Sequence, residues 1–463
     1  MMAAPRPEAY PHDPSFPQLA RASDAAQMLA IFREHLRPVA GKAVEIVDCA
    51  PFRFRCRQSE TRCVLQYTLR LKEPGTGRRW DQWVTGLIYA EPGEAERMWR
   101  KLREGEPGPE IPEPWGALEP VGFVPGLDMV VEVFPYDRRL PQLGRVMNGV
   151  VRSLSPLLLE RLGPGRWQAG EPAIAPSRYR TELGAVLRVA VPAREEGSGR
   201  RETPGCYVKV YRNERGRETF ELLRAWAEGA RPGRRPYALV RPLTYLEEHR
   251  ALVLEEAPGS SLRDLLLEAR DPVAAMRTVA RAVAAFHEDD LEVSRRYSLE
   301  EHREDLRRAA ALVLWACPEK RAKFGGVAAV VEHALEDVAP APIHRDLTPE
   351  HVFLAGNHVT FVDADSIALG DPLRDPALLL AHIAGRVGLD ALSTDQARAV
   401  AVAFGQEYLR QVPASWRKRF RLHCAGAFIE VAAGIMRSQG PGWRERVGEV
   451  ASSARHALVG EFG

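Results

Sequence analysis

The residues best suited to chemistry lie in the run Ile343–Leu354, in the C-terminal half of the chain. This run places His344, Asp346 and His351 in a polar segment with apolar, strand-like residues on both sides. Another apolar strand follows and ends at Asp363. A loop and a β-hairpin fit between the two aspartates, so folding can bring both carboxylates together at one site. Phosphoryl transfer needs such a pair, because one carboxylate accepts the hydroxyl proton and another holds a divalent cation on the phosphates.

A third motif follows at residues 370–375, which read Gly-Asp-Pro-Leu-Arg-Asp. Together, the His-x-Asp segment, the strand-ending aspartate and this motif resemble the aminoglycoside phosphotransferase and choline kinase branch of kinase-like enzymes. The resemblance extends from about Ala175 to the C-terminus, and its motifs are specific from Leu252 to Asp375. It implies a transferase that moves the γ-phosphate of ATP, with Mg²⁺ as cofactor, to a hydroxyl of a small molecule. A sugar, an amino sugar or an aminoglycoside is the kind of acceptor that it suggests.

The resemblance also implies roles for single residues. Asp346 would be the catalytic base that orients the acceptor hydroxyl, while His351 and Asp363 would hold Mg²⁺. His344 and Asp375 would brace the catalytic loop. The family most often has asparagine where this chain has His351, and an imidazole nitrogen is a softer ligand than Mg²⁺ usually takes. An acidic surface loop is the plain alternative, and the strands that flank both aspartates argue against it.

A single lysine, Lys209, lies in the apolar, strand-like run Cys206–Tyr211. By the same resemblance, its ammonium group would face the ATP phosphates and would need an acidic partner from the next helix. Glu218 and Glu221 both qualify, and the sequence does not choose between them. A solvated lysine at the edge of a sheet is the plain alternative.

Two further nucleotide contacts are marked more weakly. The run Leu252–Leu262 resembles the family's hinge, where backbone groups near Glu255 and Ala257 would bind adenine before a Pro-Gly turn starts the large lobe. A strand that ends in a turn gives the same string of residues. For the loop that covers the phosphates, the chain has no Gly-x-Gly-x-x-Gly motif, and Gly184 is the one candidate residue.

The first third of the chain repeats the organisation of the second. Ala50–Arg55 is echoed by Ala175–Arg180, and each is followed by a strand-like run, a Gly-containing hairpin loop and another apolar strand. A helix with tryptophan near its end and two more β-like segments complete each copy. Where the second copy has Lys209, the first has Thr85, which cannot hold phosphates electrostatically. We therefore expect the first copy to be a small lobe without its ATP-binding lysine and without a catalytic large lobe.

These patterns predict an α+β chain with a bilobal, protein-kinase-like fold. An antiparallel-sheet small lobe and a mainly helical large lobe would be preceded by an extra small-lobe-like α+β domain. We expect a degenerate small-lobe-like domain with a Pro-rich tail at 1–160, the small lobe at 161–256 and the helical large lobe with the catalytic loop at 257–463. The cluster Gly163–Gly165 marks the joint between the two copies.

Two helix starts can also be predicted within the helical region. Asp271-Pro272 has the form of an N-cap followed by proline at the first helical position. Ser393–Gln396 has the form of a capping box, in which a serine and a glutamine satisfy each other's backbone N–H groups.

Composition excludes several classes of function. Lys and Arg number 64 against 62 Asp and Glu, a net charge of +2, which gives no electrostatic reason to bind nucleic acid or a membrane. The segment Met1–Ala20 is Pro-rich and lacks the apolar region of a signal peptide. The longest apolar runs, such as Leu378–Ala384, are too short to cross a bilayer. We therefore expect a cytoplasmic protein.

The cysteines carry no metal pattern, because no two of them form a CxxC pair. We expect all six to be reduced, as is usual in the cytoplasm. They are Cys49, Cys56, Cys63, Cys206, Cys317 and Cys424.

A second hypothesis belongs to a different class, a nucleotide-binding pseudokinase that acts as a regulatory or scaffolding module. His351, the missing Gly-rich motif and the degenerate first copy favour it. The presence of Lys209, Asp346 and Asp363 together argues against it, since binding alone does not require a catalytic base. The N-terminal copy would then be either a cap that shapes access of the acceptor or a docking module for a protein partner.

Overall fold

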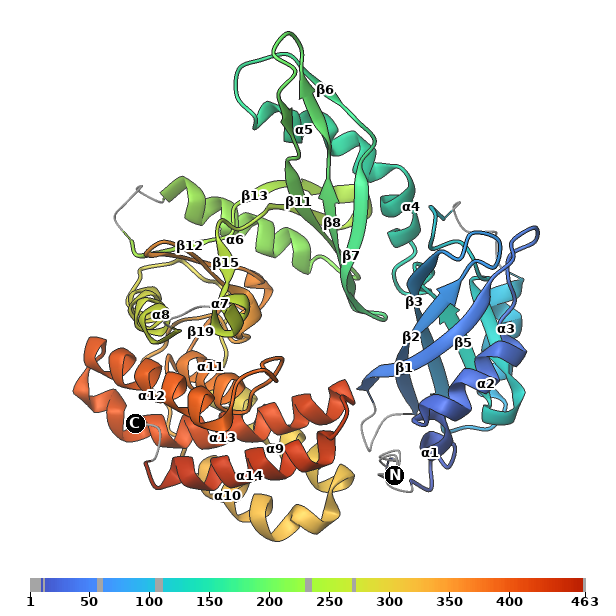
Figure 1. Ribbon diagram of the computed structural model, residues 1–463. Coiled ribbons are helices and arrows are strands. Elements are labelled where there is room, and N and C mark those ends of the chain that lie inside the picture. Colours follow the sequence, from blue (N-terminus) through green and yellow to red (C-terminus); the bar gives the residue numbers. More distant parts are fainter. Residues whose placement is uncertain are drawn as a thin grey trace. The chain divides into compact units, whose positions relative to one another are not determined.

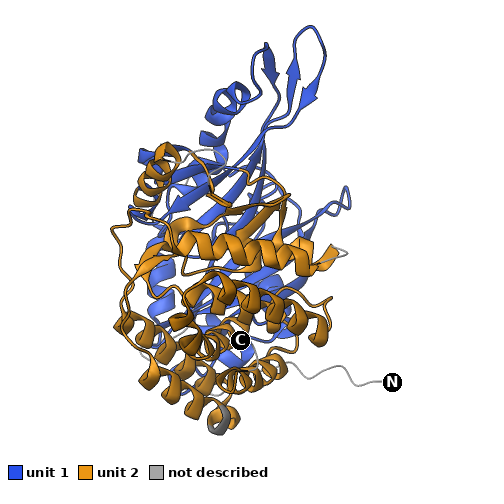
Figure 2. Cartoon of the chain, turned by 90° about the vertical axis from the view of Figure 1, so that its left-hand side faces the viewer, with its two compact units in different colours: residues 1–217, 243–255, 437–439 blue, residues 218–242, 256–436, 440–463 orange. Residues whose placement is uncertain are grey.

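The fold combines antiparallel sheets with a large helical region. The computed structural model describes residues 10, 13–55, 61–104, 111–229, 235–268 and 272–460. The chain forms two compact units, coloured blue and orange in Figure 2. Unit 1 consists of residues 1–217, 243–255 and 437–439, and unit 2 of residues 218–242, 256–436 and 440–463. The domain boundary near residue 160 stays a prediction.

Unit 1 begins with a five-stranded antiparallel sheet in the order β1-β2-β3-β5-β4 (Figure 1). Its first three strands are long: β1 is buried at only a few positions, whereas β2 and β3 are buried along most of their length, as in strands covered on both faces. Helices α2 and α3 pack on this sheet. The bounds are α1 Leu19–Ala22, α2 Ala25–His35, β1 Glu45–Arg55, β2 Arg62–Lys72, β3 Arg79–Tyr89, α3 Glu94–Arg103, β4 Val121–Val124, η1 Pro125–Leu127 and β5 Met129–Val133.

A second five-stranded sheet of unit 1 has the order β7-β8-β11-β14-β13, the same topology as the first. A small sheet in the order β10-β9-β6 is added to it. The bounds are β6 Trp167–Ala169, β7 Ala173–Arg180, β8 Gly184–Ala190, β9 Ala193–Glu195, β10 Arg201–Glu202, β11 Gly205–Tyr211, β13 Pro242–Leu246, η3 Glu247–His249 and β14 Ala251–Glu255. Helix α6, Arg215–Gly229, follows β11 and belongs mostly to unit 2.

The two sheets agree in detail as well as in strand order. The repeated Ala-Pro-x-Arg motif forms a register shift at the same place in each, between Pro51 and Arg53 in β1 and between Pro176 and Arg178 in β7. A short 3-10 turn then precedes the last strand of each copy. The sequence repeat is therefore a structural repeat.

Register also establishes which residues correspond. The residue paired with the bulge arginine is Gln66 in the first copy and Val186 in the second. Across the next strand, Gln66 pairs with Thr85, whereas Val186 pairs with Lys209. Thr85 therefore occupies the place of Lys209, as predicted from the sequence.

On the last paired strand, the same row of the first copy holds a buried carboxyl group, Glu132, where the second copy has Leu252. Burial, and then the nearby charge of Asp137, raise the pKa of Glu132 to about 8. The Arg138 guanidinium opposes this shift, but its Nε lies 3.6 Å away from Oε1.

We expect the Glu132→Gln substitution to change how stability depends on pH. The folded-state pKa lies above the unfolded value, so wild-type protein loses stability as pH rises from about 4.5 to about 8. The variant should lack this loss, on the order of 2–4 kcal/mol between pH 5.5 and 8.5. Urea unfolding at both pH values measures it, with exposed Glu119→Gln as the control. Equal pH dependence in wild type and Glu132→Gln would contradict the buried-carboxyl interpretation.

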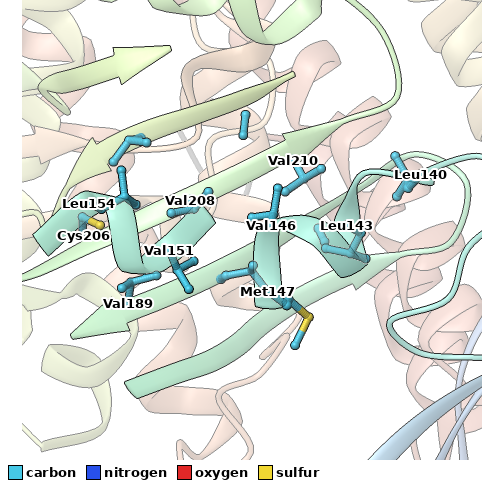
Figure 3. Packing of buried hydrophobic residues seen from close by; sticks show 14 of the residues in the cluster. Leu140, Leu143, Val146, Met147, Val151, Leu154, Val189, Cys206, Val208 and Val210 are labelled. Atoms are coloured by element: carbon cyan, nitrogen blue, oxygen red, sulfur yellow. The ribbon is translucent and has the colours of Figure 1, made fainter. Parts of the chain in front are cut away.

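The segment between the two sheets covers one face of the second sheet. It forms α4 Leu143–Asn148, η2 Val150–Leu154 and α5 Ser155–Glu160. Figure 3 shows Val146, Val151 and Leu154 of this segment directed at strand residues that include Val208 and Val210. Since side chains alternate along a strand, Lys209 points to the opposite face of the sheet.

Unit 2 contains the helical region and two small sheets, in the orders β12-β18-β17-β15 and β16-β19. The strands are β12 Tyr237–Leu239, β15 Ser260–Ser261, β16 Ala341–Ile343, β17 Val352–Ala355, β18 His358–Phe361 and β19 Ala368–Gly370, with the short turns η4 Pro318–Lys320, η5 Pro349–His351 and η6 Ala364–Ser366. The helices are α7 Leu262–Glu268, α8 Pro272–His287, α9 Leu299–Ala316, α10 Arg321–Ala334, α11 Arg374–Ala384, α12 Thr394–Gln411, α13 Ala414–Ser438 and α14 Trp443–Leu458.

The predicted capping box is confirmed at the start of α12. The Ser393 side chain accepts from the Gln396 N–H, and the Gln396 side chain accepts from the Ser393 N–H. The predicted N-cap Asp271 lies outside the described residues. The predicted α+β class, with an antiparallel small-lobe sheet, a mainly helical large lobe and an extra small-lobe-like domain before them, is confirmed.

One prediction about the cysteines is wrong. Cys63 is disulfide-bonded, and its partner lies outside the described residues. Four cysteines are free and buried, namely Cys49, Cys206, Cys317 and Cys424. No helix in the described ranges is long and apolar enough to span a membrane.

Candidate active site

The predicted catalytic residues of unit 2 converge. Asp346 and His351 lie in the loop between β16 and β17, and Asp363 follows β18. The β17–β18 hairpin pairs Val352 with Phe361, and the Val362 N–H donates to the His351 carbonyl at 3.0 Å. This register places Asp363 next to the loop that carries Asp346 and His351. One ligand atom from each of Asp346, His351 and Asp363 lies within 4.8 Å of the others.

His351 has a defined orientation within this cluster. Its Nδ1 is 2.6 Å from the backbone carbonyl oxygen of Asp346, and a carbonyl only accepts, so Nδ1 carries a hydrogen. Nε2 then faces the Asp363 carboxylate, at 3.3 Å from Oδ2. With the hydrogen on Nδ1, the Nε2 atom of a neutral ring carries a lone pair that faces the Asp363 carboxylate. A cation between Nε2 and this carboxylate would stabilise the arrangement.

The three clustered side chains differ in how far they are exposed to solvent. The Asp346 side chain is 45% exposed, the Asp363 side chain 23% and the His351 side chain 8%. Asp346 is thus the group that a molecule from solvent can reach most readily. Asp363 and Arg345 both have a positive φ, of 61° and 67°, a backbone conformation that costs energy for non-glycine residues and is common at functional sites.

The buried carboxylate of Asp375 holds the loop between β16 and β17, which is the predicted catalytic loop. Its two oxygens accept the backbone N–H groups of His344 and Arg345, at 2.6 and 2.8 Å. His287 Nε2 lies 3.2 Å from Oδ2, and the Tyr408 hydroxyl is 2.9 Å from the other nitrogen of that ring. Burial alone would raise the pKa of Asp375, but the hydrogen bond and charge of His287 lower it below the usual value.

His344 lies beneath the cluster and is 1% exposed. Its Nε2 donates to the carbonyl of Val362, at 2.8 Å, which ties the catalytic loop to the strand before Asp363. Burial is the main reason that the pKa of His344 is lowered, so the ring is neutral. These contacts accord with a bracing residue, and that role stays a prediction.

A group that the sequence did not reveal flanks the loop. The Tyr297 ring has the Arg345 guanidinium at 3.8 Å and the Arg374 guanidinium at 4.9 Å from its centroid. Arg374 is buried and forms two 2.8 Å hydrogen bonds with Glu430. Arg374 falls inside the Gly-Asp-Pro-x-x-Asp motif, which was a usable signal, whereas nothing in the sequence marked Tyr297.

Tyr297 and Arg374 also line a cavity of about 260 Å³. Acidic and imidazole groups contribute to its wall, among them His302, Glu336 and Asp371. Its lining, within the described residues, does not include the three clustered side chains.

Lys209 belongs to unit 1, and the Asp346–His351–Asp363 cluster belongs to unit 2. Lys209 is buried to 9% exposure on β11, with Nζ 5.7 Å from the Tyr211 ring centroid. Glu218 and Glu221 are both exposed on α6. The acidic partner of Lys209 therefore stays open between them.

The predicted hinge follows β14. The Glu255 side chain forms an ion pair with Arg161, and Glu255 pairs with Cys206 across the sheet. Ala257 is half-buried, and its backbone forms no hydrogen bond with another described residue. Gly259 has a φ of 84°, and a Cβ there would stand 1.9 Å from the Leu354 carbonyl oxygen, so only glycine fits this turn.

Gly184, the residue predicted for the phosphate-covering loop, lies directly after the tip of the β7–β8 hairpin. It begins β8, and a Cβ there would lie 2.8 Å from the Val210 carbonyl oxygen, so the glycine allows close packing of two strands. The tip between β7 and β8 is Thr181–Leu183, which contains no glycine. Nothing in the sequence marked this tip as a functional loop.

Comparison with known proteins identifies a family. The model of the phosphotransferase enzyme family matches residues 166–418, more than half of the chain. No curated protein sequence matches the chain.

Several solved structures are similar to part of the chain. An ADP-bound aminoglycoside phosphotransferase is 12% identical, with a TM-score of 0.39, over 67% of this chain and 99% of that one. The choline kinase LicA from Streptococcus pneumoniae is 12% identical, with a TM-score of 0.42, over 66% of this chain and 98% of that one. A spectinomycin phosphotransferase with ADP and spectinomycin is 12% identical, with a TM-score of 0.40, over 63% of this chain and 92% of that one. At these values the similarities support no assignment of substrate.

Proposed function

The chain belongs to the phosphotransferase enzyme family, and from this premise we propose that it transfers the γ-phosphate of ATP to a hydroxyl of a small molecule. The acceptor class would be a sugar, an amino sugar or an aminoglycoside-like compound. The observation that carries the proposal is the convergence of Asp346, His351 and Asp363 within 4.8 Å.

The cluster fits a divalent cation of the Mg²⁺ type. Two of its three donors are carboxylate oxygens, which hard cations prefer, and the third is an imidazole nitrogen whose ring is oriented by a backbone carbonyl. His351 and Asp363 would hold the ion. A bound ion would offset the negative charge of the ATP phosphates.

The remaining chemistry falls to side chains of the protein. Asp346 would accept the proton of the acceptor hydroxyl and orient its oxygen toward the γ-phosphate. The Lys209 ammonium would offset charge on the phosphates, with Glu218 or Glu221 as its partner. Backbone groups near Glu255 and Ala257 would bind adenine.

The three-segment division is part of this proposal. Residues 1–160 would form a degenerate small-lobe-like domain, 161–256 the small lobe and 257–463 the large lobe. The first segment would cap acceptor access or dock a protein partner. A cytoplasmic location, with no nucleic acid or membrane partner, stays a prediction.

The proposal is tested by ADP release from full-length protein with Mg²⁺, ATP and separate pools of sugars, amino sugars and aminoglycosides. We expect acceptor-dependent ADP release from one pool, with a phosphorylated product seen by mass spectrometry. Tight ATP binding without any acceptor-dependent release would instead support the pseudokinase. Absence of ATP binding would exclude both.

Asp363→Asn tests the metal-binding role separately. Loss of a charged ligand should raise the Mg²⁺ concentration for half-maximal activity by about 10- to 100-fold. Titration of activity with Mg²⁺ at saturating ATP measures this shift. Glu350→Gln, an exposed carboxylate of the same loop, is the control and should titrate like wild type. An unchanged titration in Asp363→Asn would assign the metal elsewhere.

A further inference from the structure

The tip of the β7–β8 hairpin, Thr181–Leu183, is held by the first copy of the repeat. This tip joins the first two strands of the small lobe, the connection that covers the nucleotide phosphates in kinase-like enzymes. Both the tip and the first sheet belong to unit 1.

Glu182, at the centre of the tip, is clamped by arginines of the first copy. Its side chain is 1% exposed. One carboxylate oxygen accepts from Arg55 at 2.8 Å and from Arg62 at 2.6 Å, and the other accepts from Arg138 at 2.6 Å. Burial alone would raise the pKa of Glu182, but these guanidinium groups lower it below the usual value, so the carboxylate is charged. Three charge-assisted contacts on one buried group form a strong attachment.

A second attachment joins two buried hydroxyl groups. Thr85 and Thr181 are 0% and 2% exposed, and their hydroxyl oxygens lie 2.6 Å apart. Asp137 adds two bonds, accepting the Tyr179 hydroxyl at 2.9 Å and the Glu182 backbone N–H at 2.7 Å. The Glu182 N–H is therefore committed to protein and is not a donor for phosphate.

The residues that hold the tip correspond to nucleotide-binding positions of the second copy. Thr85 occupies the place of Lys209 in the aligned registers. Asp137 follows β5, as the predicted hinge follows β14. The face of the first copy that corresponds to a nucleotide site is thus filled by the hairpin tip of the second copy.

We propose that the first copy is a receptor for this tip, and that Thr85 and Arg138 are positioning residues which fix the phosphate-covering loop before nucleotide binds. The inference rests on the proposed function, since it assigns the loop to ATP. A loop already fixed loses less conformational entropy on binding, so the attachment increases nucleotide affinity. It also replaces the Gly-rich motif that the sequence lacks.

The test compares full-length wild type with Thr85→Val, Thr181→Val, the double variant, Arg138→Met and Arg138→Lys. Thr85→Val keeps the side-chain shape and removes one hydroxyl, so it should fold. Arg97→Met is the matched control, because Arg97 forms only exposed ion pairs on α3 of the same copy. Hydrogen exchange of the tip amides without nucleotide reports attachment, and calorimetric titration with ADP and Mg²⁺ reports affinity.

We expect Thr85→Val and Arg138→Met to speed exchange at residues 181–184 and to weaken ADP binding by about 5- to 10-fold each, the effect of one buried hydrogen bond. Arg138→Lys should restore part of both. The threonine double variant should be no worse than either single one, since both remove the same bond. The acceptor KM should stay within twofold, and the ATP KM should rise. Arg97→Met should match wild type.

Hydrogen exchange at the tip that is unchanged in Thr85→Val and Arg138→Met would overturn the proposal that the first copy is a receptor for the tip. Faster exchange with unchanged or tighter ADP binding would overturn the positioning role, because the clamp would then hold the loop away from nucleotide. A wild type that binds no ADP at all would overturn the proposed function itself and, with it, the link to ATP. The two failures are therefore distinguishable.

Discussion

Replacing Asp346 by asparagine should lower kcat by about 10²- to 10⁴-fold, the usual contribution of a positioned general base. The amide keeps the size of the side chain but cannot take the proton of the acceptor hydroxyl. ADP binding should be retained or tightened, because the variant removes a negative charge from a cluster that would face phosphates. Acceptor-dependent ADP release measures the first effect, and calorimetric titration measures the second.

Glu350→Gln is the control for this variant. Glu350 lies four residues further along the same loop, its side chain is 67% exposed, and its nearest partner is Arg263 at 3.8 Å. It should keep wild-type kcat. If Asp346→Asn retained turnover comparable with that control, the base would have to be another group, and the assignment of the site would fail.

Asp375→Asn should cost about 3–5 kcal/mol of folding free energy in unit 2. The carboxylate is fully buried and accepts two backbone N–H groups, so an amide places an N–H against one of these donors. Activity should fall as well, because those donors belong to the loop that carries Asp346. Urea unfolding, followed by far-UV circular dichroism, measures the loss.

The pH dependence gives this variant a second signature. The pKa of Asp375 is lowered in the folded protein, so its stabilising effect is present above the unfolded value and is lost as pH falls through the folded one. Asp375→Asn should therefore differ most from wild type at neutral pH and less in acid. Asp390→Asn, whose side chain is 77% exposed, should cost less than about 0.5 kcal/mol at either pH. A loss of similar size in both variants would contradict the bracing role.

The sequence predicted the repeat because the relevant signals are local. The Ala-Pro-x-Arg motif forms the same register shift in β1 and β7, and proline at a bulge is expected since it cannot donate to a ladder. Alignment of the apolar strands that follow the two hairpin loops then matched Thr85 with Lys209. The capping box at Ser393 is local in the same sense.

The clustering of Asp346 and Asp363 was predictable for a related reason, since a short hairpin lies between them. The clamp on Glu182 was not, because it brings together residues from three distant segments of the chain. Tyr297 was missed on the same grounds, as its partners Arg345 and Arg374 follow it by many residues. A local pattern does not encode such packing.

Gly184 and Cys63 show the limits of a local signal. A glycine near a predicted loop suggested phosphate binding, and the close contact of β8 with β11 gives a second reason for glycine there. The expected cytoplasmic location suggested that all cysteines are reduced, whereas Cys63 is disulfide-bonded. The close contact at Gly184 depends on which backbone lies opposite, and only the assembled sheet decides that.

The helices that connect the two copies have a consequence for how the gene can be divided. Val146, Val151 and Leu154 precede residue 160, yet they form the apolar lining of the sheet that carries Lys209. A protein that begins at residue 161 would leave that lining behind and present a bare aliphatic sheet to water. The two copies can therefore not be exchanged as independent units, because the C-terminal helices of the first copy form part of the hydrophobic core of the second. Any recombination point that preserves the catalytic half has to fall before α4.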